Sequence, residues 1–416
     1  MQINLDDLTD PVLTDVQRQV LEYTESRAVV FDVEAMLAEA VGQAGVDDLA
    51  ADDGYAARLQ AYIDAIESDT GLRQLTRNTL HARVIRLLRN RLSLTELLRR
   101  HPEISAIEID RPLIVVGMPR SGTTHLVNLI AQDPRRRALP YWESQEPIPA
   151  PGQGPGPSGV DPRYARAKAE HDGLMATAPY IAAMHDQFPE AIEEEVELLD
   201  LDLAAYVLEW HARVPGWRDT YLGLDQSRHY RYLRTVLQAL TFLRGPRTWV
   251  LKSPQHAEQL APLMATFPDA TVAFTHRDPV AVIQSAATMM AYSDRLRRRS
   301  IEPQWLIEYW TDRVHRLLSC CVRDRDLVPA DRSLDIGFHQ LNGNEMPVLE
   351  EVYRRAGVDV PPSVGGRFQA YIDSNRRGAK GAIPYDLQRH FGVAPDELRS
   401  RFDFYFDRFD VRPEAQ

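Results

Sequence analysis

The 416-residue sequence has little cysteine and no long apolar run. Its two cysteines, Cys320 and Cys321, are adjacent and cannot form a disulfide framework, so nothing indicates an oxidising compartment. No run of about 18 apolar residues predicts a membrane span, and no basic-then-apolar stretch at the start predicts a signal peptide. We therefore expect a cytoplasmic protein without a membrane span.

Positive charge is scarce as well. The formal net charge is -12, which argues against a nucleic-acid partner, because phosphate backbones are bound by basic faces. A single pocket can still be locally basic, so an anionic small molecule is not excluded. Carboxylates gather from Glu190 to Asp202 without a matching pair of histidines. We interpret them as a solvated helix face and expect no metal site.

The chain is organised around Arg111 to Gln132, which reads RPLIVVGMPRSGTTHLVNLIAQ. Leu113 to Val116 are apolar and mostly β-branched, which predicts a short buried strand. The turn from Gly117 to Thr124 is rich in glycine and hydroxyl groups, and apolar residues then follow at helical spacing. A strand, a glycine-containing turn and a helix direct backbone N–H groups and a helix N-terminus at a phosphate.

This loop departs from the nucleoside-triphosphate pattern GxxxxGK[ST] at one position. Gly117 and Gly122 match its two glycines, but Thr123 stands where the lysine would be. The cation of the loop is Arg120. The missing lysine disfavours an ordinary ATPase or kinase. Hydroxyl groups and one arginine suit a dianionic group that needs no metal.

The first 105 residues predict amphipathic helices and no strand. The last of these helices is rich in arginine, and we interpret its charged side as a solvated face. The alternative is a lid or a subunit contact, so a homo-oligomer stays open. We expect residues 1–105 to form a helical extension that packs on the rest, residues 106–416. The four helical segments are expected at 12–23, 33–41, 55–66 and 72–98.

After the phosphate loop, strands alternate with helices, which predicts crossover units and a mainly parallel sheet flanked by helices. The fold class is therefore α/β, a P-loop-type sandwich. Residues 147–162 are dense in proline and glycine and are expected to form a loop, which we interpret as a flap beside the ligand site. Further strands are expected at 135–141, 247–251, 271–275 and 333–337, and helices at 162–175, 193–205, 225–243, 255–266 and 280–292.

Three segments together resemble sulfotransferases that use 3′-phosphoadenosine 5′-phosphosulfate (PAPS). They are PRSGTT from Pro119 to Thr124, WVLKSPQH from Trp249 to His256, and TVAFTHRDPVAVIQS from Thr271 to Ser285. The resemblance is to bacterial sulfotransferases with an N-terminal helical extension, and to the tyrosylprotein type in the wording of the loop. It implies transfer of a sulfuryl group to a hydroxyl or amine of a small-molecule or lipid acceptor.

The resemblance also implies roles for individual residues. Arg120 would stabilise the leaving oxygen, and Lys252 would contact the transferring sulfonate. Arg277 and Ser285 would hold the 3′-phosphate, as a guanidinium fork suits phosphate oxygens. The 5′-phosphate would lie on Arg120, Ser121, Gly122, Thr123 and Thr124, and a weakly matching basic segment adds Arg377 and Lys380 to the 3′-phosphate site.

The general base is open between two residues. Glu143 matches the catalytic glutamate of the tyrosylprotein type, and His256 lies near the position of a catalytic histidine in other members. Either side chain can act as a base if its pKa lies near the working pH. We favour Glu143 narrowly, since a capping or packing role accounts for His256 equally well.

Two other functions compete with this interpretation. One is a P-loop kinase or nucleotide hydrolase, disfavoured by Thr123 and by the lack of a Walker B carboxylate at the end of a strand, since Phe274 to Arg277 ends in cations. The other is a catalytically silent nucleotide-binding protein, disfavoured because the expected site residues are all present, namely Arg120, Glu143, Lys252, Arg277 and Ser285. The sequence does not identify the acceptor.

Overall fold

A parallel sheet forms the centre of the computed structural model, which describes residues 3–46, 54–150, 152–154, 159–375 and 383–414. Among these residues the sheet has five strands in the order β2-β3-β1-β4-β5, and every neighbouring pair is parallel. This confirms the predicted α/β sandwich. The strands are β1 (Leu113–Gly117), β2 (Arg136–Arg137), β3 (Thr248–Lys252), β4 (Thr271–His276) and β5 (Ser333–Gly337).

Both faces of the sheet are covered, as expected for a parallel sheet with apolar strands. Alternate residues of β1 point to opposite faces. Leu113 and Val115 join one buried apolar cluster, and Ile114 and Val116 join the other. The first face carries α5 (Thr123–Ile130), α16 (Glu345–Arg355) and α17 (Pro362–Ser374), and the second carries α11 (Gln226–Arg244), α12 (Leu260–Thr266), α13 (Pro279–Arg297) and α14 (Pro303–Asp324).

Two predicted elements are shorter or divided. The strand expected at 135–141 is reduced to Arg136–Arg137. The chain then leaves the sheet to pair with the segment around Ile192, where the Leu139 carbonyl accepts from the Glu193 amide over 2.8 Å, and α6 (Tyr141–Gln145) follows directly. The helix expected at 255–266 is divided at Gln259, whose φ of -134° and ψ of 35° are not helical and separate a 3₁₀ turn, η4 (Pro254–Glu258), from α12.

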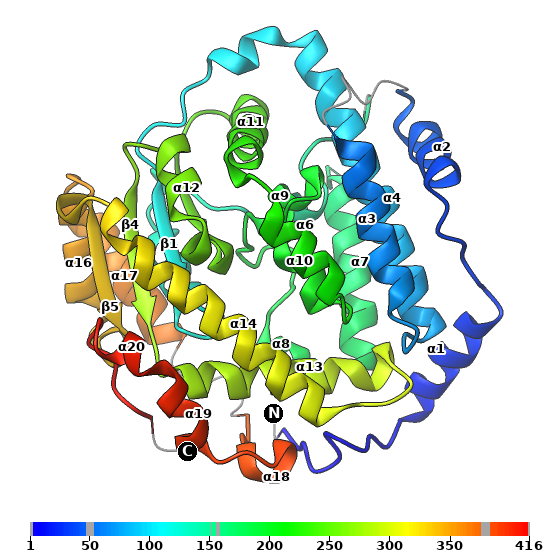
Figure 1. Cartoon of the computed structure of the whole chain (residues 1–416). Coiled ribbons are helices and arrows are strands. Elements are labelled where there is room, and N and C mark those ends of the chain that lie inside the picture. Colours follow the sequence, from blue (N-terminus) through cyan, green and yellow to red (C-terminus); the bar gives the residue numbers. More distant parts are fainter. Residues whose placement is uncertain (1–2, 47–53, 151, 155–158, 376–382, 415–416) are drawn as a thin grey trace.

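The four helices expected near the N-terminus are present. Their apolar sides belong to the same buried cluster as the second face of the sheet. In Figure 1 these blue helices flank the green and yellow ones, on the side of the molecule away from β5. Within the described residues, no helix is long and apolar enough to cross a membrane. The helices are α1 (Asp15–Glu25), α2 (Val33–Ala44), α3 (Tyr55–Ser68) and α4 (Gln74–Arg100).

The arginine-rich side of α4 is buried in part, so its interpretation as a solvated face is wrong. Arg83 pairs with Glu197 and Asp200, each at 2.7 Å. Arg91 lies 2.6 Å from Asp202, which is 1% exposed. The acidic run and the basic helix neutralise each other inside the protein, because buried charges require partners.

The acidic run also fails to form the single helix expected at 193–205. Only α9 (Val196–Leu199) is α-helical, and a 3₁₀ turn, η2 (Asp200–Asp202), follows it. Leu203 then has a φ of 49°, in the left-handed region, which ends the turn. Along this irregular path Glu197 and Asp200 both reach Arg83, and Asp202 reaches Arg58 and Arg91.

The remaining helices are mostly short and lie in two groups. α7 and α8 precede the acidic run, α10 follows it, and the others belong to the C-terminal part of the chain. Figure 1 shows the last three, in orange and red, beside α13 and α14. They are α7 (Pro162–Thr177), α8 (Ile181–Met184), α10 (Pro215–Gly223), α15 (Phe338–Leu341), α18 (Leu387–Phe391), α19 (Pro395–Arg399) and α20 (Asp403–Phe406).

Candidate active site

The phosphate-type loop follows β1 at the carboxyl edge of the sheet and packs directly on β4. A Cβ atom on Gly117 would lie 2.1 Å from Thr275 Oγ1, so only glycine fits there. Ser121 Oγ donates to the Met118 carbonyl over 2.6 Å and lies 2.7 Å from Thr275 Oγ1. The Ser121 amide also bonds to Met118, over 3.2 Å. Ser121, expected to face the 5′-phosphate, therefore holds the shape of the loop.

Gly122 to Thr124 form the N-terminus of α5. Gly122 has a φ of 96°, a left-handed conformation that suits glycine, and Thr123 and Thr124 form the first turn. The first amides of a helix have no intrahelical acceptor, and the helix dipole favours an anion there. The strand, the glycine-containing turn and the helix are thus arranged in the order that the sequence predicts.

Arg120 adopts an uncommon backbone conformation, with a φ of 69°. Its Nε donates to Ser285 Oγ over 3.1 Å, and its Nη1 donates to the Met184 carbonyl. Such backbone strain costs about 1–3 kcal/mol and persists where surrounding contacts impose it. Here it directs the guanidinium from the loop toward α13 and the end of α8.

Lys252 ends β3, the neighbour of β1, and its side chain is 1% exposed. Its Nζ donates to Thr124 Oγ1 over 3.3 Å and to Glu194 Oε1 over 2.7 Å. The ammonium thus lies beside the start of α5. Because carboxyl ends of parallel strands meet at one edge, Lys252 reaches the loop as expected.

Glu194 is the carboxylate that contacts Lys252, and the sequence alone did not indicate it as a site residue. Burial raises its pKa, and Lys252 offsets that effect only in part. The adjacent Glu193 lies 3.0 Å from His185. Burial alone would lower the pKa of His185, but the carboxylate of Glu193 raises it above its ordinary value. The run of carboxylates from Glu190 to Asp202 was visible in the sequence, but its spacing did not show which of them contacts Lys252.

Glu143, one of the two expected bases, is bound by two arginines. It is 2% exposed, its Oε2 accepts from Arg137 over 2.7 Å, and its Oε1 accepts from Arg244 over 2.8 Å. Each carboxylate oxygen therefore has a guanidinium partner. Glu143 joins β2 to the end of α11, and its role as the base stays a prediction from the resemblance.

His256, the other expected base, is fully buried in η4. Its Nε2 lies 2.6 Å from Glu195 Oε1, and its Nδ1 lies 2.8 Å from the Tyr230 hydroxyl. Glu195 Oε2 in turn accepts the backbone amide of Lys252 over 2.7 Å. Both ring nitrogens are engaged, so His256 supports the end of β3, and its role as the base also stays a prediction.

Arg277 and Ser285, the two residues expected at the 3′-phosphate, each contact Arg120. Arg277 Nη1 donates to the Arg120 carbonyl over 2.6 Å, and its guanidinium lies 4.1 Å from the centre of the Phe338 ring. Ser285 is 3% exposed and lies within reach of both Arg120 and the Tyr385 hydroxyl, the latter at 2.7 Å. Arg376, Arg377 and Lys380 lie outside the described residues.

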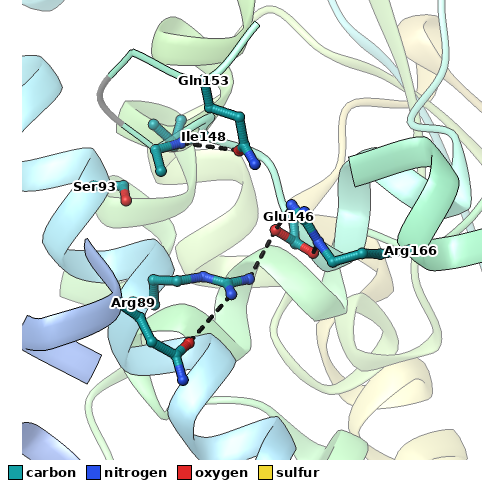
Figure 2. Close-up of a pocket in the computed structure, with 8 residues that line it drawn as sticks. Arg89, Ser93, Glu146, Ile148, Gln153 and Arg166 are labelled. Atoms are coloured by element: carbon teal, nitrogen blue, oxygen red, sulfur yellow. Dashed lines mark hydrogen bonds and ion pairs between the residues drawn. The ribbon is translucent and has the colours of Figure 1, made fainter. Parts of the chain in front are cut away.

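A separate polar cavity of about 120 Å³ lies between α2, α4 and the segment after α6. Figure 2 shows Glu146 between Arg89 and Arg166, which it contacts at 2.7 Å each. None of the residues expected to bind the donor lines this cavity. Within the described part of the chain, no group of three His, Cys, Asp or Glu side chains could hold a metal ion.

Comparison with known proteins places this arrangement in a family. The chain is similar to the crystal structure of sulfotransferase STF9 from Mycobacterium avium, with 22% identity over 93% of this chain and 99% of that chain, and a TM-score of 0.81. It is similar to sulfotransferase STF1 from Mycobacterium tuberculosis H37Rv, with 25% identity over 90% and 98%, and a TM-score of 0.77. No curated protein matches the sequence. The sulfotransferase family model matches residues 112–362, from β1 to the start of α17, and the chain therefore belongs to the sulfotransferase family.

Proposed function

We propose that this protein transfers a sulfuryl group from PAPS to a hydroxyl or amine of a small-molecule or lipid acceptor. The observation that carries the proposal is the convergence of cationic side chains at the carboxyl edge of the sheet. The Arg277 side chain donates to the Arg120 carbonyl, the Arg120 side chain donates to Ser285, and the Lys252 ammonium donates to Thr124 at the start of α5. The family membership supports sulfuryl transfer as the reaction.

The residues fit a donor with two phosphate-type groups. The amides at the start of α5 suit the 5′-phosphate. Arg277 suits the 3′-phosphate, because its Nε and Nη2 already hold a carboxylate, that of Glu414, in two parallel hydrogen bonds of 2.6 and 2.8 Å. The loop is thus a better match to PAPS than to ATP, since Thr123 replaces the lysine that contacts the terminal phosphates.

In the transfer, the acceptor oxygen or nitrogen bonds to sulfur while the bond from sulfur to the 5′-phosphate oxygen breaks, and adenosine 3′,5′-bisphosphate leaves. Lys252 would stabilise negative charge on the sulfonate, and Arg120 would stabilise charge on the leaving oxygen. A base must take the acceptor proton. Lys252 is buried and hydrogen-bonded on both sides, so its ammonium is oriented before the donor binds.

Glu194 is our candidate for the base, in place of Glu143 and His256. It touches Lys252, which would contact the sulfonate, whereas both oxygens of Glu143 bind arginines and both ring nitrogens of His256 are engaged. Burial raises the pKa of Glu194, which makes its carboxylate a better proton acceptor than an exposed glutamate.

Glu194→Gln is expected to lower kcat by about 10²–10⁴-fold, the range typical of a general base. Activity of the unmodified protein should fall with decreasing pH as Glu194 becomes protonated. Because its pKa is raised, this loss should begin above the ordinary glutamate value of about 4.3. The pH profile of kcat, measured with an acceptor found by screening phenols and alcohols, should lose this acidic limb in Glu194→Gln.

Glu143→Gln and His256→Gln provide the comparison for this assignment. We expect each to keep the acidic limb, even where it lowers stability. An inactive Glu143→Gln or His256→Gln variant that folds, together with an active Glu194→Gln variant, would return the role to the other residue.

The donor is tested most directly by calorimetric titration with adenosine 3′,5′-bisphosphate, with ATP and magnesium as the comparison. We expect the bisphosphate to bind and Arg277→Ala to weaken it by about 10–100-fold, the loss expected for charge-assisted hydrogen bonds. Arg354→Ala removes an arginine that is 65% exposed and should change the affinity little. Binding of ATP without the bisphosphate would favour the kinase alternative instead.

A further inference from the structure

The guanidinium expected to hold the 3′-phosphate is already occupied by a group of the protein itself. Glu414 lies 137 residues from Arg277 in the sequence, and its two carboxylate oxygens accept from Nε and Nη2 of that arginine over 2.6 and 2.8 Å. These are the two parallel bonds that a phosphate would take. The side chains of Arg277 and Glu414 are 13% and 29% exposed.

The backbone of Glu414 is held in place as well. Its amide donates to Asp278 Oδ2 over 2.9 Å, and Asp278 Oδ1 caps α13 at Val280 over 3.0 Å. Arg399 donates to the same Asp278 oxygen over 3.1 Å and to the Glu414 carbonyl over 3.4 Å. The position of Glu414 therefore depends on two side chains at the ends of separate helices, Asp278 at the N-cap of α13 and Arg399 at the end of α19.

Residues 383–414, which include Glu414, form the C-terminal segment, and a second residue of this segment reaches the expected 3′-phosphate site. The Tyr385 hydroxyl lies 2.7 Å from Ser285 Oγ, the other group expected at the 3′-phosphate. In Figure 1 this segment, in orange and red, runs beside α13. It lies beyond residues 112–362, the part of the chain that the family model matches.

We infer that Glu414 is an internal, displaceable occupant of the 3′-phosphate site. The inference rests on the proposed function, since it assigns the 3′-phosphate to Arg277. In the free protein the carboxylate neutralises Arg277 and keeps its fork oriented over Phe338. A 3′-phosphate carries more negative charge and more acceptor oxygens than a carboxylate, so it displaces Glu414 toward water. Binding of the donor and contact of the tail with Arg277 then exclude each other.

Calorimetric titration of Glu414→Gln with adenosine 3′,5′-bisphosphate tests this exclusion. Glutamine keeps the backbone bonds to Asp278 and Arg399 but loses the charge that pairs with Arg277. We expect the bisphosphate to bind roughly tenfold tighter than to the unmodified protein, because the site no longer has to be vacated. Adenosine 5′-monophosphate, which lacks the 3′-phosphate, should bind both proteins equally.

Glu397→Gln is the matched control, because Glu397 is exposed in α19 and its removal changes the net charge by the same amount. It should leave both affinities unchanged. If Glu414→Gln bound the monophosphate tighter by the same factor, or if Glu397→Gln bound the bisphosphate tighter by the same factor, the effect would come from overall charge. Either result would overturn the inference.

The inference and the proposed function fail in different ways. If the unmodified protein prefers the bisphosphate to the monophosphate, and Glu414→Gln does not alter that preference, the displacement is wrong and the donor assignment stands. If neither protein binds the bisphosphate, both are wrong. If Glu414→Gln binds the bisphosphate tighter, and adding Arg277→Ala abolishes this increase in affinity, both the displacement and the donor assignment are supported.

Discussion

Lys252→Met is expected to lower kcat by about 10²–10³-fold while the protein still folds and binds adenosine 3′,5′-bisphosphate. Lys252 is 1% exposed and its ammonium lies between Thr124 and Glu194, at 3.3 and 2.7 Å. Under the proposed mechanism it stabilises charge that develops on the sulfonate only during transfer. Methionine fills a similar volume without the charge, so the loss should appear in kcat rather than in the affinity for the bisphosphate.

The measurement is a single-turnover rate with PAPS and an acceptor from the phenol and alcohol screen, next to calorimetry with the bisphosphate. Lys168→Met is the control, since the Lys168 side chain on α7 is 42% exposed and pairs with Asp172 at the surface. A rate within a few-fold of the unmodified protein would exclude Lys252 from the transfer. A parallel loss of bisphosphate affinity would assign it to donor binding instead.

Asp202→Ala is expected to lower the free energy of unfolding by about 3–5 kcal/mol, the cost of breaking a buried ion pair from one side. Asp202 is 1% exposed and lies 2.8 Å from Arg58, 2.6 Å from Arg91 and 2.6 Å from His229 Nδ1. These partners come from α3, α4 and α11. Without the carboxylate, two guanidiniums remain buried without this anion, and the N-terminal helices lose a tie to the rest of the chain.

Urea unfolding followed by circular dichroism measures this loss. Asp172→Ala removes a carboxylate whose side chain is 58% exposed, and it should change the free energy of unfolding by no more than about 0.5 kcal/mol. A change below about 1 kcal/mol in Asp202→Ala would contradict a structural role for this cluster.

Local patterns in the sequence were sufficient to predict the sheet and the loop. The β-branched run before Gly117 forms β1, and the strands that end at Lys252 and His276 lie on either side of it. Because all three run parallel, their carboxyl ends meet at one edge. That rule alone brings Arg120, Lys252 and Arg277 to one site, without knowledge of any side-chain contact.

Contacts between segments far apart in the chain were decided by the tertiary structure. Glu194 is 58 residues from Lys252, Asp200 is 117 residues from Arg83, and no periodicity links such pairs. The sequence shows arginines along α4 and carboxylates from Glu190 to Asp202, and each set alone resembles a solvated face. Only packing shows that they are partners, because a charge can be buried when an opposite charge is brought to it.

The amino-acid sequence by itself determined the α/β class, the loop after β1 and the cations at the strand ends, since each strand, turn and helix is predicted by a short local pattern of residues. The tertiary structure decided which carboxylate reaches each cation: Glu143 joins Arg137 and Arg244, Glu194 joins Lys252, and Glu414 joins Arg277. The physical reason is that a carboxylate has no intrinsic preference among arginines and lysines. Its partner is the one that the folded backbone places within hydrogen-bonding distance.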